Sequence, residues 1–227
     1  METTYEQPAG DDGARFLRAV EIIAINPQDA KDIARKYILQ CKQKFQNLSE
    51  DDIQERVADK IIQRYVNLCT ASGGVTALSS IIPGLGTALA MVGGGLADGV
   101  VCMKFQVDMC LCLAETFGYD INDADAKHIS FYIASGGALN KAGQEVGIQL
   151  GTKMGVRLLR QYLKGAILQS IKELFKRLGI IFTRKALEKA LPFGIGVVVG
   201  ASANRAMTRY VGKQAKKFFL LDREIQR

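Results

Sequence analysis

Tryptophan is absent from this 227-residue sequence, which also has only four prolines and one histidine. A chain so poor in proline can form long helices, because proline breaks a helix interior. No segment of convincing length alternates apolar and polar residues as a half-buried strand does. Composition is that of a globular protein, with 48% hydrophobic and 23% charged residues. The sequence therefore predicts an all-α fold, a compact multi-helix bundle with glycine-rich apolar helices.

Motifs for catalysis and metal binding are also missing. The single His128 is not part of an HExxH pattern, and no CxxC is present, so zinc has no support. The Asp and Asn residues at 120–125 lack the glycine and the bidentate glutamate of a calcium loop. They predict a helix cap instead, at Asp120 or Asn122. No nucleophile elbow, dinucleotide fingerprint or P-loop occurs. We expect a non-enzymatic protein with no metal and no cofactor.

The cysteines do not form a disulfide framework. Their number is odd, and they lie in helix-like, mostly apolar segments, at Cys41, Cys69, Cys102, Cys110 and Cys112. This pattern predicts reduced thiols in a cytoplasmic setting. The polar, acidic N-terminus has neither the basic nor the apolar region of a secretory signal.

Charge is absent from Tyr65 to Ala97, a run of 33 residues. A helical membrane crossing needs about 20 apolar residues. The first part of the run, residues 65–82, is rich in Ser, Thr and Asn, and the part after Gly84 has only 13 residues before Asp98. Two full crossings are therefore not expected. The run predicts two helices that meet at a turn, built by Pro83, Gly84 and Gly86.

The same turn has apolar neighbours. Ile81, Ile82 and Leu85 are expected to form a shallow tip that contacts a membrane. The helix after the turn is expected to continue from about Thr87 to Phe117 and to end at Gly118.

Positive charge is concentrated in the C-terminal third. Residues 1–151 have 13 Lys or Arg against 19 Asp or Glu, a net charge of −6, whereas residues 152–227 have 17 against 4, a net charge of +13. Within that third, cations recur every fourth position and share one helix face, at Arg205, Arg209, Lys213 and Lys217. Such a segment favours an anionic partner, here an anionic lipid or membrane surface. Nucleic acid is not expected, because no recognition motif is present.

Glycine also recurs at every fourth position, at Gly143, Gly147, Gly151 and Gly155. On a helix these residues would form one bare stripe, and each would weaken an isolated helix by about 1 kcal/mol. Close approach of another backbone is the usual reason for such a stripe. A tight soluble core and a bilayer interface explain it equally well.

Residues 79–120, SSIIPGLGTALAMVGGGLADGVVCMKFQVDMCLCLAETFGYD, resemble the core of the EcsC family and of related helical domains appended to some bacterial GTPases. The shared pattern includes the Pro-Gly-x-Gly turn, Asp98, Gln106, and a Phe-Gly-x-Asp sequence at 117–120. Residues 191–219, LPFGIGVVVGASANRAMTRYVGKQAKKFF, are similar to the C-terminal end of that family. The resemblance covers about residues 50–220. It implies an all-helical fold and association with membranes or lipids, and it supplies no catalytic residues.

Two hypotheses of function follow. The first is a cytoplasmic protein, peripheral to the membrane, that binds lipid through its basic C-terminal helices and its apolar glycine-rich segments. The alternative is a soluble scaffold that forms homo-oligomers through its glycine stripe. Both place a flexible or short-helix segment at 1–25 before a single helical domain at 26–227.

Overall fold

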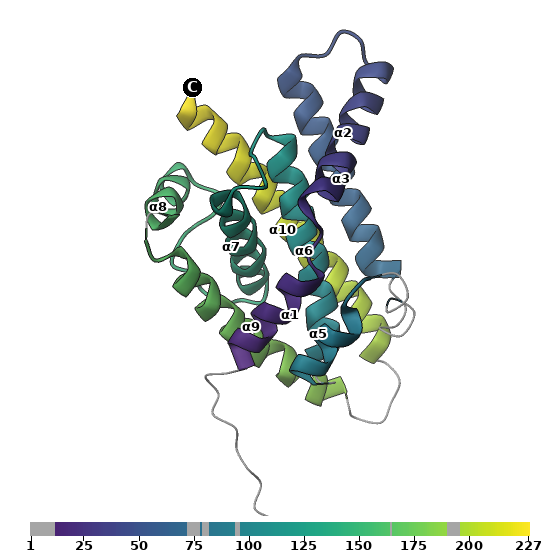
Figure 1. The fold of residues 1–227 in the computed structure, drawn as a ribbon, viewed down its shortest axis with the longest axis vertical. Coiled ribbons are helices and arrows are strands. Elements are labelled where there is room, and N and C mark those ends of the chain that lie inside the picture. Colours follow the sequence, from purple (N-terminus) through teal and green to yellow (C-terminus); the bar gives the residue numbers. More distant parts are fainter. Residues whose placement is uncertain (1–11, 72–77, 79–81, 94–95, 164, 190–195) are drawn as a thin grey trace, which may run out of the picture.

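The protein is built from α-helices, and the described residues contain no strand. The structure is a computed structural model that describes residues 12–71, 78, 82–93, 96–163, 165–189 and 196–227. Its all-α bundle confirms the expected fold class (Figure 1). The helices are α1 (Asp12–Ile23), α2 (Pro27–Lys44), α3 (Glu50–Ala71), α5 (Leu85–Val92), α6 (Ala97–Thr116), α7 (Ala124–Lys141), α8 (Lys153–Leu163), α9 (Ile167–Lys189) and α10 (Gly196–Gln226).

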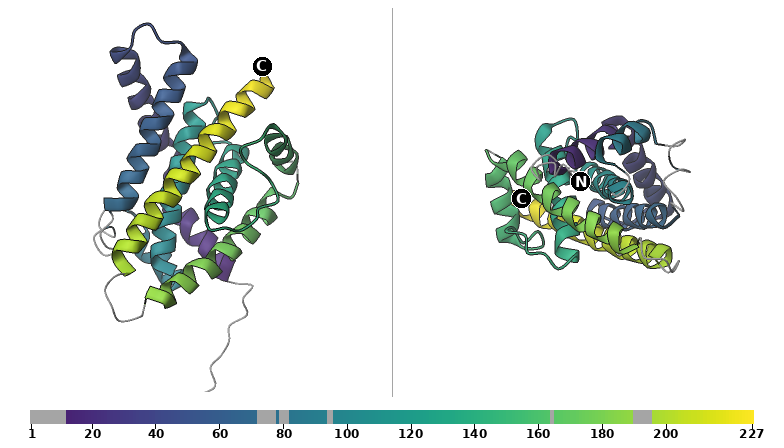
Figure 2. Two further views of the ribbon diagram at one scale, coloured as in Figure 1. Left: turned by 180° about the vertical axis from the view of Figure 1, so that it is seen from behind. Right: turned by 90° about the horizontal axis from the view of Figure 1, so that it is seen from below.

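Helix α6 runs through the centre of the bundle, as the end-on view in Figure 2 shows. It contacts α1, α2, α3, α5, α7, α9 and α10. Every residue from Gly99 to Ala114 is buried. A helix that is enclosed on all sides has no solvent face on which to place charges, which explains its apolar sequence. The core of the protein is therefore organised around α6.

The cysteines lie in this core. All five are buried and are free thiols, as expected. Burial raises the pKa of the Cys112 thiol to about 12, and it also raises the pKa of Cys110. A thiol that stays protonated in an apolar interior is chemically inert, so these two side chains serve packing.

Two start signals in the sequence, Asn26 before Pro27 and Ser49 before three acidic residues, predict helix starts, and α2 and α3 begin there. The Asn26 side chain accepts a hydrogen bond from the Asp29 N–H at 2.9 Å, and Pro27 occupies the first position of α2. The Ser49 hydroxyl accepts one from the Asp52 N–H at 3.1 Å at the start of α3. Both bonds satisfy N–H groups that a helix start leaves without partners.

The turn before α5 is also confirmed. Gly84 has a φ of 77°, a left-handed conformation that side chains rarely adopt, and α5 begins at the next residue. The chain therefore does not form one helix from residue 66 to 117. Pro83 lies in this turn with Gly84, as predicted, whereas Gly86 lies inside α5, with no atom within 4 Å of the position that a Cβ would take.

The long helix expected from Thr87 to Phe117 is broken, which corrects the prediction. Gly93 has a φ of 74° and ends α5, and α6 begins only at Ala97. The expected end of the second helix at Gly118 is confirmed by its φ of 88°. A glycine-rich apolar run thus contains a second turn that its composition alone does not reveal.

The predicted membrane tip is also corrected. Ile82 is only 5% exposed and Leu85 is fully buried, while Ile81 lies outside the described residues. Helix α1 packs on α5, and Ile22 is the nearest neighbour of Gly84, at 3.3 Å from an added Cβ. The side chains of Ile82 and Leu85 therefore point into the core and not toward a membrane.

Helix α1 belongs to the same core. Its Phe16, Ala19 and Val20 are fully buried, and the Phe16 ring meets the Phe175 ring of α9 edge-on at 5.5 Å. The segment expected to be flexible or a short helix, residues 1–25, thus contains the helix α1, which is packed against α5, α6 and α9.

The predicted glycine stripe does not exist. Gly143 has a φ of 79° and ends α7, because its own N–H bonds to Asn140 O and the next N–H bonds to Leu139 O. Residues 144–152 are not helical, so Gly147 and Gly151 lie in a loop, and Gly155 lies in α8. Four glycines at a helical period thus occupy three different structural elements.

A different glycine makes the close contact that the stripe was expected to make. In α10, a Cβ on Gly212 would lie 2.8 Å from Ile62 of α3 and 3.0 Å from the sulfur of Met109. Gly147, in contrast, has no atom within 4 Å of an added Cβ. Absence of a side chain at Gly212 therefore allows α10 to approach both α3 and α6.

This difference predicts opposite outcomes for one substitution. Gly212→Val should lower the free energy of unfolding by about 2 kcal/mol through overpacking, whereas Gly147→Val should change it by less than about 0.5 kcal/mol. The midpoints of urea unfolding measure both values. A Gly212→Val protein as stable as the parent would show that α10 and α3 are not in close contact.

Candidate functional site

Four cationic side chains form a row on the solvent face of α10. Arg205, Arg209, Lys213 and Lys217 are all exposed, because the opposite face buries Met207, Val211 and Phe218 in the core. Consecutive members lie about 6 Å apart along the axis, so the row extends about 18 Å. The structure thus places the four predicted cations together on one surface, which we call the cation row.

Lys216 and Arg223 of α10, and Arg227 just beyond it, differ from the row because they pair with carboxylates of α3. Lys216 pairs with Glu55 and Asp59 at 3.4 and 3.0 Å, and Arg223 and Arg227 both pair with Asp51 at 2.9 Å. Figure 2 shows α3 and α10 side by side, and these pairs show that they are antiparallel. Among the described residues, no hydrogen bond or ion pair involves a member of the cation row.

One further cation lies close to the row. The Lys141 ammonium group at the end of α7 is 5.8 Å from the centre of the Tyr210 ring on α10. Lys141 is exposed. Lys141 therefore adds a further positive charge beside the row.

The cation row begins near the end of the bundle where α5 lies. The last turn of α3 and the first two turns of α10 lie at the same end and contain no charged residue, whereas the first turn of α6 there contains the exposed Asp98 (Figure 1). The sequence has no charged residue from 65 to 97 or from 190 to 204. On α5, the exposed residues Thr87 and Ala90 are small. None of the helices within the described ranges has the length and apolar character that a membrane crossing requires.

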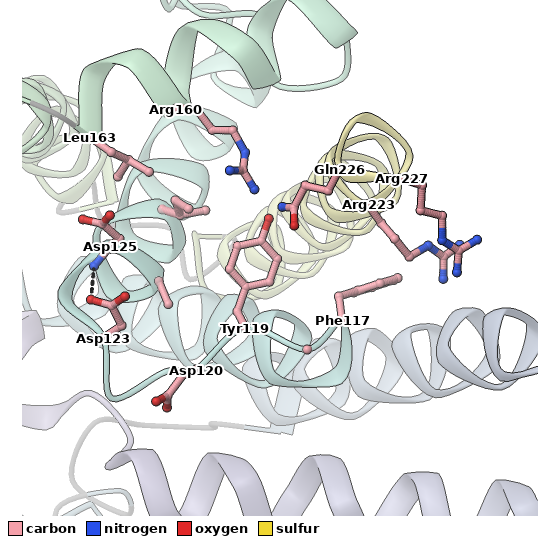
Figure 3. A pocket seen from close by; sticks show the side chains of 13 residues that line it. Phe117, Tyr119, Asp120, Asp123, Asp125, Arg160, Leu163, Arg223, Gln226 and Arg227 are labelled. Carbon is pink, nitrogen blue, oxygen red and sulfur yellow. Dashed lines mark hydrogen bonds between the residues drawn. The ribbon is translucent and has the colours of Figure 1, made fainter.

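A polar cavity of about 440 Å³ lies at the opposite end of α10 (Figure 3). It is enclosed by the turn after α6, the start of α7, the last turns of α8 and the last turn of α10. Its lining combines two rings, three guanidinium groups and three carboxylates, and consists of Phe117, Gly118, Tyr119, Asp120, Asp123, Asp125, Ala126, Ile129, Arg160, Leu163, Arg223, Gln226 and Arg227. We call it the polar cavity.

The turn after α6 places Tyr119 in this cavity. The N–H of Gly118 bonds to Glu115 O at 3.1 Å, and the N–H of Tyr119 bonds to Ala114 O at 3.0 Å, which is the pattern of a glycine-terminated helix. The Tyr119 ring packs edge-on against Phe219 at 5.1 Å. Its hydroxyl is buried, has no hydrogen-bond partner among the described residues, and points between Arg160 and Gln226 (Figure 3).

Arg160 is held at the cavity by a buried carboxylate. Asp222 is fully buried and accepts hydrogen bonds from Arg160 Nε and, at 2.7 Å, from Arg160 Nη2. The side chain of Gln226 also donates to Asp222, at 2.9 Å. Burial raises the pKa of Asp222 to about 6, while the hydrogen bond from Gln226 lowers it. The positively charged guanidinium of Arg160 also favours the ionised form of Asp222.

The opposite wall of the cavity is acidic. Asp123 is the cap of α7, since its carboxylate accepts the Asp125 N–H, so the cap is one residue past the predicted Asn122. The Asp120 carboxylate accepts the Asn122 N–H at 3.0 Å and pairs with Lys31 at 3.4 Å. These bonds, that from the Asn122 N–H most strongly, lower the pKa of Asp120. The carboxylates of Asp120 and Asp123 thus order the turn that leads into α7.

The single histidine lies at a second, more apolar hollow. His128 is half-buried and lies beside Lys127 at the edge of a cavity of about 400 Å³ that α1, α6, α7 and α9 surround. Ile121 and Ile171 form part of its floor. No group of three or more His, Cys, Asp or Glu side chains suited to a metal occurs within the described residues.

Reasoning from sequence does not find the polar cavity. Phe117, Gly118 and Asp120 belong to the Phe-Gly-x-Asp pattern, but nothing near them in the chain indicates a cavity. Arg160 and Arg223 come from segments that lie 40 and 103 residues beyond Asp120. Their convergence depends on how α8 and α10 pack, for which no local pattern gives a signal.

Comparison with known proteins identifies the family. No curated protein and no solved structure matches the chain. The family description that matches is that of the EcsC protein family, over residues 20–221. This range includes the turn at Gly84, the whole of α6 and most of α10. The resemblance seen in residues 79–120 and 191–219 is therefore confirmed, and the chain belongs to the EcsC protein family.

Proposed function

We propose that the protein binds the surface of membranes that contain anionic lipids, as a non-enzymatic, cytoplasmic and peripheral membrane protein. The observation that carries this proposal is the contrast within α10. Carboxylates of α3 pair with Lys216, Arg223 and Arg227, whereas no described carboxylate pairs with a member of the cation row. A row of cations that the protein leaves uncompensated suits a partner with a dense negative charge.

The energetics fit a reversible interaction. A basic side chain near an anionic membrane gains about 1 kcal/mol, within a Debye length of about 8 Å at physiological salt. Four such side chains supply about 4 kcal/mol in total. That free energy localises a protein to a surface without anchoring it there.

Helix α5, at the end of the bundle where α10 begins, supports the same orientation. Arg205, the first member of the row, follows the start of α10 by nine residues, and α5 presents small residues such as Ala90 to solvent. Headgroups can approach α5 without burial of a charged side chain of that helix, whose cost is high. The five free thiols suit a reducing compartment.

Flotation with lipid vesicles tests the proposal. We expect the full chain to float with vesicles that contain phosphatidylserine, to float less with phosphatidylcholine vesicles, and to dissociate in high salt. Equal binding to both vesicle types, or no binding to either at low salt, would refute the electrostatic proposal.

The alternative of a soluble scaffold rests on a feature that the structure lacks. Gly143, Gly147, Gly151 and Gly155 do not share a helix, so they cannot form the contact surface between subunits that the alternative requires. No other observation favours a homo-oligomer, and we do not carry that function forward.

A further inference from the structure

We propose that the polar cavity binds a small soluble zwitterion, a molecule that carries a phosphate or carboxylate group and an ammonium group. The anionic group would lie against Arg160 and Tyr119, and the ammonium group against Asp123 and Asp125. This binding goes beyond the proposed attachment to membranes and does not depend on it.

Hydrogen-bond donors without partners define the anionic half of the site. Arg160 uses Nε and Nη2 on Asp222, so the N–H groups of Nη1 remain available. The hydroxyl of Tyr119 is buried, lacks a partner and points toward this guanidinium (Figure 3). A buried hydroxyl without a partner is rare in native proteins, and an oxygen acceptor between Tyr119 and Arg160 would satisfy it.

The side of the cavity formed by α10 has an excess of positive charge. Arg223 and Arg227 share a single carboxylate, that of Asp51. One of the two guanidinium charges is therefore not neutralised. An anionic group in the cavity would be attracted from this side as well as from Arg160.

Carboxylates without cationic partners define the other half. Asp123 caps α7 through a backbone N–H, and within the described residues neither Asp123 nor Asp125 forms an ion pair. An ammonium group beside them would also meet the ring of Tyr119, whose face attracts cations. The acidic wall therefore favours a positively charged group.

The two halves together exclude simpler ligands. A plain anion would be repelled by Asp123 and Asp125, and a plain cation by Arg160 and Arg223. Only a molecule with both charges is complementary to the whole lining. The volume of about 440 Å³ lies within the range of small-molecule sites.

The position of the cavity allows separate tests of the two proposals. Arg223 lies about 27 Å along α10 from Arg205, where the cation row begins. Substitutions in the middle of the row, at Arg209 and Lys213, should therefore leave ligand binding in the cavity unchanged.

Calorimetric titration of the full chain with three zwitterions, phosphoethanolamine, phosphocholine and β-alanine, tests the inference. At least one should bind saturably and about tenfold more tightly than inorganic phosphate and ethanolamine. Absence of saturable binding by all three, or equal binding of phosphate alone, would overturn it.

Two substitutions test which residues bind the anionic group and which bind the ammonium group of the ligand. Tyr119→Phe removes only the unpartnered hydroxyl and should weaken binding of the zwitterion about tenfold. Asp125→Asn should weaken binding of the zwitterion without weakening binding of inorganic phosphate. Tyr162→Phe and Asp32→Asn, which change exposed residues outside the cavity, are the matched controls. Full affinity in both cavity variants would contradict the assignment, and melting curves confirm that each variant is folded.

A membrane headgroup has the same chemistry as the soluble probes, so one further measurement separates them. Vesicles of phosphatidylethanolamine should not bind through the cavity, and Asp125→Asn should leave their flotation unchanged. Flotation that Asp125→Asn abolishes, together with no binding of the soluble probes, would overturn the proposal of a soluble ligand.

Discussion

Charge reversal of two residues in the cation row, Arg209→Glu together with Lys213→Glu, is expected to release the protein from anionic vesicles. Each basic residue contributes about 1 kcal/mol at such a surface, and each introduced carboxylate is repelled by a similar amount. The total change is about 4 kcal/mol, a loss on the order of a thousandfold in partitioning. Flotation over a series of lipid concentrations measures this loss.

A matched control separates the row from net charge. Arg35→Glu with Lys36→Glu makes the same change of charge on exposed residues of α2, on the other side of α3. This control should retain most of the binding, and both proteins should keep the helicity of the parent, because all four residues are exposed. Equal loss in the two variants would show that overall charge, and not the row, attracts the protein to lipid.

The sequence predicts those parts of the fold that depend on a few consecutive residues. Asn26 with Pro27 and Ser49 with its acidic successors start helices, because a cap acts on N–H groups two or three residues away. The turn at Gly84 follows from the same logic, since its backbone angle needs no distant partner. All of these features appear in the structure where the sequence places them.

Features that depend on packing could not be predicted in this way. Glycines at 143, 147, 151 and 155 have the spacing of a helix stripe, yet the first of them ends α7. A glycine favours a helix end and a close helix contact alike, so spacing cannot distinguish the two. The sequence around Ile82 and Leu85 favours a membrane tip, because no neighbouring residue indicates that α1 covers them.

The two candidate sites differ in the same way, because one depends on neighbouring residues of a single helix and the other on distant segments. The cation row could be predicted because its four members lie on one helix at a regular period. The pairing of Lys216 and Arg223 with carboxylates could not be predicted, because Asp59 and Asp51 lie 157 and 172 residues away. The polar cavity likewise depends on distant segments. The contrast that supports membrane binding therefore becomes visible only once α3 and α10 are placed side by side.

Two buried charged residues of α6 have a role that could not be predicted from the sequence. Lys104 and Asp108 are 8% and 3% exposed and form an ion pair at 2.5 Å in the core. The other oxygen of Asp108 accepts the Ile25 N–H at 2.8 Å, where α1 leads into α2. Burial raises the pKa of Asp108, while Lys104 and this N–H act in the opposite direction. The carboxylate thus connects the central helix to the junction between two outer helices.

Replacement of Asp108 by alanine is expected to be the most destabilising of the changes considered. It leaves the Lys104 ammonium group in the core without its partner, and it leaves the Ile25 N–H without an acceptor. Loss of one partner from a buried ion pair costs about 3–5 kcal/mol. Urea unfolding of Asp108→Ala measures the change, and a loss below about 1 kcal/mol would mean that water reaches Lys104 and solvates it.

The double variant Lys104→Met with Asp108→Ala separates the two costs. Methionine has a similar length and no charge, so the double variant keeps only the unsatisfied Ile25 N–H and the smaller side chain at position 108. We expect it to be about 2 kcal/mol more stable than Asp108→Ala alone, a coupling within the range measured for contacting residues. Strictly additive effects of the two substitutions would show that Lys104 and Asp108 do not act as a pair. In both variants we expect faster hydrogen exchange at the Ile25 N–H, because its hydrogen bond depends on Asp108 and not on Lys104.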